Sequence, residues 1–371
     1  MSATVEELVE RSAILKRELL GYAWQGREGR DLSEAVVARF GDPVVSTEEE
    51  LTDFVDRFVL THRLSDDRTV LERFVRSRGE LPRAERDLLL RWRDPLEGYF
   101  DVQALDGQAL VCTNVIDELT YRIRTNVGAT FFQDRTPPGS IMLARVVPLL
   151  DEWLISGIVS VFHADRRDDA LRAAWEAAQD WPALLFRNPA KLESAWRQQG
   201  EDRAAFVAYF GSDEVVVPGA DLMERWAAFW GQRYGDDAPP SADLSDLADA
   251  ATVGLIYDER HGFGFYQDYG RFEEVFARPP LALDAEQLQV VDRYLRDESV
   301  NGVPFVRCAQ RYPEAVDVVL AQVLRRPRFR WSGDGDELLR RYKPGFLDAA
   351  PQPQFLPFGD QFAHLAGGVG G

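Results

Sequence analysis

The feature of this sequence that most constrains its fold is a change of hydrophobic period at Asp94-Pro95. Before this point, apolar residues recur at helical spacing, and one such helix begins at Thr47, whose distance from Glu50 is that of a capping box. After it, apolar and polar residues alternate, as in a strand with one buried face. The alternation ends near His163, where the helical spacing returns. We therefore predict a β-module inside a mainly helical chain.

Five strands are predicted within residues 96–163. Asp106-Gly107 is typical of a two-residue hairpin turn, and Pro148 to Asp151 turns the chain into the last strand. Short strands with short connections favour a partly closed barrel of the SH3-like or OB-like kind, because closure removes exposed edges. The predicted fold class is α+β: mainly helical, with an inserted five-stranded antiparallel β-barrel-like module.

The other boundaries follow from composition. We predict an N-terminal helical segment at 1–95, the β-module at 96–163 and a second helical segment at 164–235. The acidic, Pro-rich stretch 236–250 is typical of a linker. Residues 251–343 are predicted to form a β-hairpin followed by helices. Residues 344–371 are rich in Pro and Gly, which predicts an irregular tail.

Charge and composition bound the class of protein. The net charge of −19 favours solubility and opposes non-specific attraction to nucleic acid. No apolar stretch approaches the roughly 20 residues that cross a bilayer, and no apolar signal-peptide region occurs near the N-terminus. Cys112 and Cys308 lie in apolar segments, which predicts buried free thiols in a reducing compartment. We therefore predict a cytoplasmic protein without membrane association. Only three of the 43 basic residues are lysines, a bias typical of high-GC bacterial genomes.

Two groups of residues are candidates for nucleic-acid binding. The first is an arginine cluster with interleaved aromatic residues, which could contact phosphates and stack on bases. The second is on the outward side of the third predicted strand. The candidates are Arg325, Arg326, Arg328, Phe329, Arg330 and Trp331 in the first group, and Arg122 and Arg124 in the second. For the first group, pairing of the arginines with the chain's own carboxylates is the favoured alternative.

A third candidate lies at the tip of the predicted hairpin. Asp258, Glu259 and His261 could bind a divalent ion or act as acid and base. A solvated turn explains the same residues and is the favoured interpretation. The four histidines are scattered, and zinc-ligand spacings, phosphate-binding glycine motifs and a GxSxG elbow are all missing from the sequence. The sequence therefore predicts no cofactor and no catalytic residue.

The segment from Phe54 to Phe162 resembles a group of uncharacterised bacterial proteins that are sometimes found with a SEC-C motif. The likeness is in Phe58-Val59 and in residues 69–74, 96–102, 138–145 and 153–162. The SEC-C motif is a cysteine-rich zinc element associated with protein or nucleic-acid contact. This chain has no such cysteine cluster, so the resemblance implies neither zinc binding nor site residues here.

Three functions remain open. The favoured one is a non-enzymatic interaction or regulatory protein with a protein partner, because no dense group of catalytic residues accompanies the helical and β segments. The second is a nucleic-acid-associated protein that uses the arginine cluster and one face of the β-module. The third is a metal-assisted enzyme at the hairpin tip.

Overall fold

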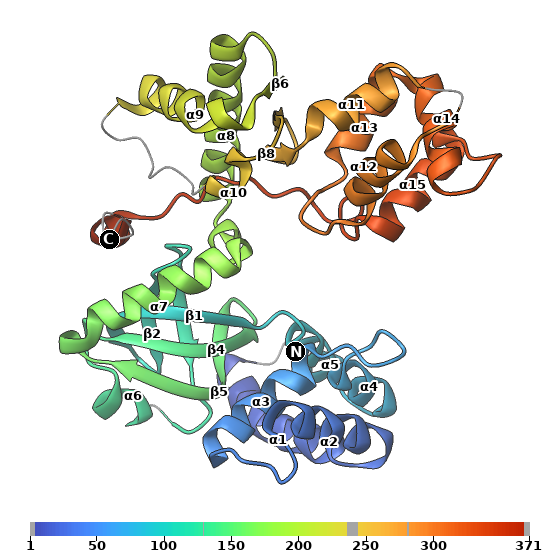
Figure 1. Ribbon diagram of the computed structural model, residues 1–371. Coiled ribbons are helices and arrows are strands. Elements are labelled where there is room, and N and C mark those ends of the chain that lie inside the picture. The colour runs from blue at the N-terminus through green and yellow to red at the C-terminus, as the bar shows by residue number, and fades with distance from the viewer. Residues whose placement is uncertain (1–3, 129, 236–243, 280–281, 367–371) are drawn as a thin grey trace. The chain divides into compact units, whose positions relative to one another are not determined.

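The computed structural model describes residues 4–128, 130–235, 244–279 and 282–366 (Figure 1). It is a mixed α/β fold in which 56% of the residues are helical, so the prediction of a mainly helical chain is confirmed. The chain divides into two compact units. Of the described residues, those up to 188 and 358–366 form unit 1, and those between 189 and 357 form unit 2.

Unit 1 begins with a bundle of five helices. The bounds are α1 Val5–Ala23, α2 Gly26–Phe40, α3 Glu48–Thr61, α4 Val70–Ser77 and α5 Arg83–Arg91. The predicted capping box at Thr47 and Glu50 is confirmed at the start of α3. Buried side chains of the bundle, such as Phe74 and Trp92, share one core with Val147 and Leu154 of the β-module. The bundle therefore packs directly against the module.

The β-module contains the five predicted strands. Their bounds are β1 Leu96–Asp106, β2 Ala109–Asn114, β3 Thr120–Arg124, β4 Ile141–Leu149 and β5 Glu152–Phe162, with α6 Thr130–Arg135 between β3 and β4. The first hairpin turns through Gly107 and Gln108, one residue later than predicted, and only Gly107 has a positive φ. Asp106 instead pairs with Ala109, which extends β1 by one residue.

The prediction of a purely antiparallel sheet is wrong. Each strand pairs with two others, in the order β1-β2-β3-β5-β4 and back from β4 to β1, so the sheet closes on itself. Four of these pairings are antiparallel, and the pairing between β3 and β5 is parallel. The reason is geometric: an odd number of strands in a closed ring cannot alternate in direction throughout.

After the module, the chain forms a helix that covers part of the sheet. The elements are η1 Ala164–Arg166, α7 Arg167–Asp180 and η2 Pro182–Arg187. Figure 1 shows α7 lying across the strands of the module. The C-terminal elements η4 Asp360–Phe362 and α16 Ala363–Ala366 belong to the same unit, and η4 contacts α7. Part of the segment predicted as an irregular tail thus packs against unit 1.

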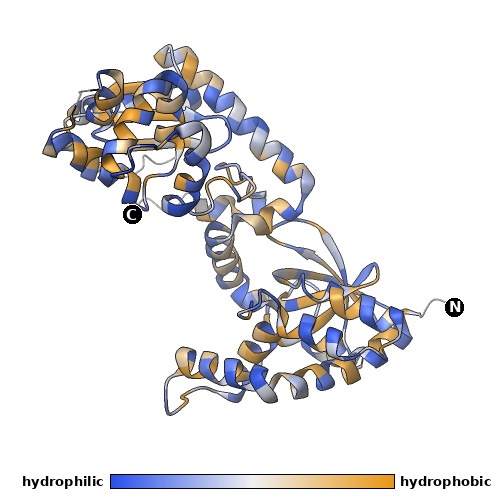
Figure 2. Cartoon of the chain, turned by 90° about the vertical axis from the view of Figure 1, so that its right-hand side faces the viewer, coloured by the Kyte–Doolittle hydropathy of each residue, from blue (hydrophilic) through white to orange (hydrophobic). Residues whose placement is uncertain are grey.

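Unit 2 combines a small sheet with helices. Its elements are α8 Pro189–Phe210, β6 Glu214–Val217, α9 Gly219–Tyr234, α10 Ser245–Ala248, β7 Val253–Asp258, β8 Gly262–Gln267, α11 Tyr269–Ala277, α12 Ala285–Arg296, α13 Val303–Arg311, α14 Pro313–Val323 and α15 Trp331–Tyr342. The predicted hairpin is β7 and β8, and the short strand β6, which the alternation did not reveal, pairs with β7. Figure 2 shows hydrophobic and hydrophilic residues alternating along the helices, as expected of elements with one buried face.

The predicted linker at 236–250 lies partly outside the described residues, which resume at Leu244. Leu244 is buried, and the backbone N–H of Gly219 donates to the carbonyl of Ala250 at 3.2 Å. Residues 244–250 therefore pack against α9 rather than extending away from it.

Two further sequence predictions concern the cysteines and the crossing of a membrane. Cys112 and Cys308 are buried free thiols, as predicted, and burial raises the pKa of Cys112 to about 12. Within the described ranges, no helix is both long enough and apolar enough to cross a membrane.

Candidate functional site

A network of buried charges joins α1 and α3 to strands β4 and β5. Arg145 Nη1 donates to Asp56 Oδ2 at 2.8 Å, and the Lys16 ammonium contacts Asp56 Oδ1. Lys16 Nζ donates to Ser156 Oγ at 2.8 Å, and Ser156 Oγ donates to Asp56 Oδ2 at 3.0 Å. Because Asp56, Arg145 and Ser156 are buried, these groups are compensated by one another rather than by water.

The network continues toward the surface. Arg145 Nη2 donates to Asp53 Oδ1 at 2.9 Å and to Glu97 Oε2 at 3.3 Å. Arg57 Nη2 donates to the same oxygen of Glu97 at 2.6 Å. One arginine from the module is thus held by carboxylates from α3 and β1.

A β-bulge places the central residues. Arg145 pairs with Ser156 across β4 and β5, whereas Ala144 pairs with Val159, so Gly157 and Ile158 form the bulge. Gly157 has φ +84°, and a Cβ at this position would lie 3.1 Å from both Arg145 Nη1 and Asp56 Oδ2. Only glycine suits this conformation and leaves room for the ion pair.

The local charges determine the ionisation of the network. Burial alone would raise the pKa of the Asp56 carboxyl, but Lys16 and Arg145 together hold it below its ordinary value. Burial likewise opposes the charge on Arg145, but Asp56, Asp53 and Glu97 outweigh it and raise the pKa of the guanidinium. Asp56 and Arg145 therefore favour each other's charged forms, whereas burial lowers the pKa of Lys16 although Asp56 opposes that shift.

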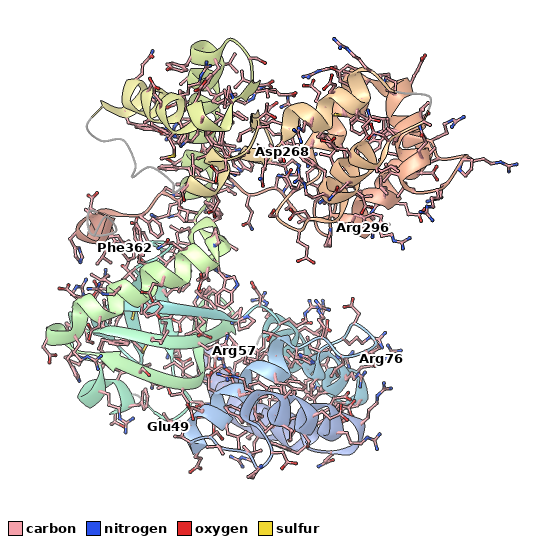
Figure 3. The ribbon with its side chains drawn as sticks, in the orientation of Figure 1. Glu49, Arg57, Arg76, Asp268, Arg296 and Phe362 are labelled. Carbon is pink, nitrogen blue, oxygen red and sulfur yellow. The ribbon has the colours of Figure 1, made fainter. Side chains whose placement is uncertain are left out.

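Three adjoining cavities follow the seam between α3 and the module. Their volumes are about 320, 550 and 280 Å³. The first two share Glu49 and Ile158, and the last two share Arg57 and Arg145. We call these three cavities the seam groove. Figure 3 labels Glu49 and Arg57 on the side of α3 that faces the module.

The seam groove has a charged floor and apolar ends. Val127, at the first end, is 67% exposed, and Trp181, at the other end, is 64% exposed. Ser156 and Lys16 line the first cavity, but they do not form an activated nucleophile. A serine–lysine pair needs the hydroxyl proton directed at the amine, whereas here Lys16 Nζ donates to Ser156 Oγ and Ser156 Oγ donates to Asp56. The arrangement is suited to binding.

The predicted nucleic-acid residues do not form one site. Arg122 and Arg124 lie on β3 in unit 1, and both are bound to Glu152, at 3.0 and 2.5 Å. The cluster 325–331 lies in unit 2, between α14 and α15. There Phe329 is buried in the core, so its ring is not free to stack on a base, and Trp331 is partly buried against the same core.

The four arginines of this cluster are exposed. Arg326 Nη2 lies 3.5 Å from Asp334, and Arg330 Nε lies 3.6 Å from Asp317. Within the part of the chain that the structure describes, Arg325 and Arg328 have no ion-pair partner. The favoured alternative of pairing with carboxylates thus applies to two of the four.

The hairpin tip has the geometry of a turn. Asp258 Oδ1 accepts hydrogen bonds from the backbone N–H groups of Arg260 and His261, both at 3.0 Å, and Glu259 is exposed. The His261 ring stacks on Phe346, and burial lowers its pKa below the ordinary value. Over the described residues, no group of three or more His, Cys, Asp or Glu side chains is arranged to hold a metal ion.

Sequence reasoning missed the Lys16–Asp56–Arg145 network. Its signal was present: Asp56 interrupts the apolar face of a predicted helix, and Arg145 interrupts the apolar strand at 141–147. An ionisable residue inside an otherwise apolar pattern needs a partner when it is buried. The identity of that partner could not be read from residues so far apart in the sequence.

Comparisons of this chain with models of protein families, with curated proteins and with solved structures find no match. The resemblance to proteins found with a SEC-C motif therefore stays a prediction.

Proposed function

We propose that this chain is a non-enzymatic, cytoplasmic interaction protein that binds a basic, extended segment of a partner protein in the seam groove. The observation that carries the proposal is the groove itself, whose charged floor is held in place by the buried network. A pre-organised surface loses little conformational entropy when it binds.

The charge of the whole chain indicates the partner. The groove itself carries both signs: Glu49, Arg39 and Arg135 line it, and within the described residues none of the three has an ion-pair partner. With a net charge of −19, the chain attracts basic segments over a distance and repels acidic ones. The exposed Trp181 and Val127 supply apolar anchor points, and tryptophan is enriched among residues that dominate binding energy.

A peptide selection tests this proposal. We expect the full chain to enrich basic peptides with a bulky apolar residue over acidic ones from a random library. Trp181→Ser should weaken binding of an enriched peptide by about tenfold or more, because a buried tryptophan anchor contributes at least about 1.4 kcal/mol.

The matched control is Trp24→Ser, because Trp24 is also exposed, at 49%, but lines none of the three cavities. Its peptide affinity should equal that of the unaltered chain. Equal losses in the two variants, or enrichment of acidic peptides, would count against the seam groove as the binding site.

We further propose that the β-module is an OB-like barrel rather than an SH3-like one. The closed five-stranded ring, its one parallel pairing between β3 and β5, and the helix α6 between β3 and β4 support this assignment. OB-like barrels often bind oligonucleotides on the face of strands 2 and 3. Here the arginines of that face are engaged by Glu152 and Asp106, which favours a protein partner.

A second candidate function is binding of single-stranded nucleic acid by the arginine cluster of unit 2. It is favoured by two exposed arginines, Arg325 and Arg328, which have no ion-pair partner among the described residues. We expect any such binding to be weak and to depend steeply on salt, because the buried Phe329 leaves charge as the main contribution.

Fluorescence anisotropy with a labelled single-stranded oligonucleotide at low salt tests this function. Arg325→Ala with Arg328→Ala should reduce the slope of log K against log salt by about 0.7 for each phosphate that the chain no longer neutralises. The control pair Arg83→Ala with Arg166→Ala removes two exposed arginines elsewhere and should leave the slope unchanged. A flat titration of the unaltered chain would exclude the function.

A further inference from the structure

The C-terminal segment 358–366 packs on unit 1, although the described residues between 189 and 357 belong to unit 2. Its contacts with α7 include two aromatic pairs. The Phe358 ring stacks on Trp175 with a centroid distance of 3.9 Å, and the Phe362 ring lies 5.8 Å from Trp175. Phe362 is fully buried. Figure 3 shows Phe362 beside α7.

Polar contacts fix the position of the segment. Gln361 Nε2 donates to the carbonyl of Val115 at 2.7 Å and to Glu118 Oε1 at 3.3 Å. A Cβ at Gly359 would lie 1.7 Å from Glu118 Oε1, so a larger residue would displace one of the two. The surface formed by α7 and residues 115–118 thus recognises two phenylalanines four residues apart, with a glycine and a glutamine between them. We call this surface the α7 site.

The segment is tethered to the α7 site through unit 2, and tethering supplies a high local concentration that a free peptide must exceed. Release of the segment exposes the site, and a second segment of the same sequence fits it.

We propose that the α7 site is an exchangeable recognition site, and that the C-terminal segment of a second copy of this chain can occupy it. Every copy carries both the site and its ligand. When two copies exchange their C-terminal segments, each segment makes the same contacts with the α7 site of the other copy. The second segment docks more easily than the first, because the first has already joined the two copies. This inference does not depend on the function proposed for the seam groove.

Two complementary variants of the full chain test the proposal. Phe358→Ser with Phe362→Ser leaves the α7 site empty, and Trp175→Ser damages the site but keeps the segment. A synthetic peptide of residues 353–366, labelled with a fluorophore, should bind the first variant saturably. Binding to the unaltered chain should be about tenfold weaker or more, because its own segment competes. Adding Trp175→Ser to the first variant should abolish peptide binding.

Sedimentation at high protein concentration then tests exchange between copies. Each variant alone should remain monomeric, and their mixture should form a mixed dimer. Peptide binding without a mixed dimer would overturn exchange between copies, and absence of both would overturn the α7 site itself. Because Phe362 is buried, Phe358→Ser alone is the milder variant, and circular dichroism confirms that each variant is folded before it is compared.

Discussion

Replacement of Asp56 by asparagine is expected to lower the free energy of unfolding by about 3 kcal/mol at neutral pH. The change leaves the Lys16 ammonium buried beside Ser156 without its carboxylate. Arg145 keeps Asp53 and Glu97 as partners, which limits the loss to the lower part of the range for broken buried pairs. Urea unfolding of both proteins measures the difference.

Two variants of the same network sharpen this test. Asp53→Asn removes a partner of Arg145 from the same helix, but the Asp53 side chain is 35% exposed, so we expect a loss below about 1 kcal/mol. Adding Lys16→Met to Asp56→Asn should restore part of the lost stability, because it removes the unpaired ammonium. Equal losses for Asp53→Asn and Asp56→Asn would show that burial of the charge is not what matters.

The pH dependence has a definite sign. The pKa of Asp56 is held below its ordinary value in the folded chain, so the unfolded chain binds this proton more tightly. The contribution of Asp56 is therefore complete above a pH of about 4, the ordinary value, and is lost as the pH falls through the folded pKa. The stability difference between the unaltered chain and Asp56→Asn should shrink over that acidic window.

Gly157→Ala is expected to lower the free energy of unfolding by about 2–3 kcal/mol. At φ +84° an alanine is strained, and its Cβ would meet Arg145 Nη1 and Asp56 Oδ2 at 3.1 Å. The ion pair must then shift within a buried network, and the floor of the seam groove shifts with it. Urea unfolding gives the stability, and affinity for a selected peptide reports the groove.

Another glycine of the chain provides a close control for Gly157→Ala. Gly139 has the same φ of +84°, but apart from its chain neighbours no described residue has an atom within 4 Å of a Cβ built there. Gly139→Ala should therefore show the backbone strain alone, about 1 kcal/mol, without a change in peptide binding. If both substitutions had equal effects, contact with the ion pair would not be the cause.

Local patterns predicted much of the fold. The period change at Asp94-Pro95 placed the start of the β-module, and the capping box at Thr47 placed the start of α3. Such features depend on neighbours within a few residues, which a sequence displays directly. The strand β6 was not predicted, because four residues are too few to show the alternation of apolar and polar side chains that marks a strand.

In the β-module, the strands could be predicted from the sequence, but their pairing could not. Five strands were evident from alternation, but their directions were predicted as all antiparallel. Closure of an odd number of strands requires a parallel pairing, and the structure places it between β3 and β5. Alternation along each strand specifies which side chains face inward. It does not specify which strands meet.

The candidate sites depended still more on the tertiary structure. The sequence by itself determined that the chain is acidic and mainly helical, and that it contains a five-stranded module and two cysteines in apolar segments. Only the tertiary structure brought Lys16, Asp56 and Arg145 together and returned Phe362 to α7. The physical reason is that burial and charge pairing act between side chains close in space, whereas a sequence records only their order along the chain.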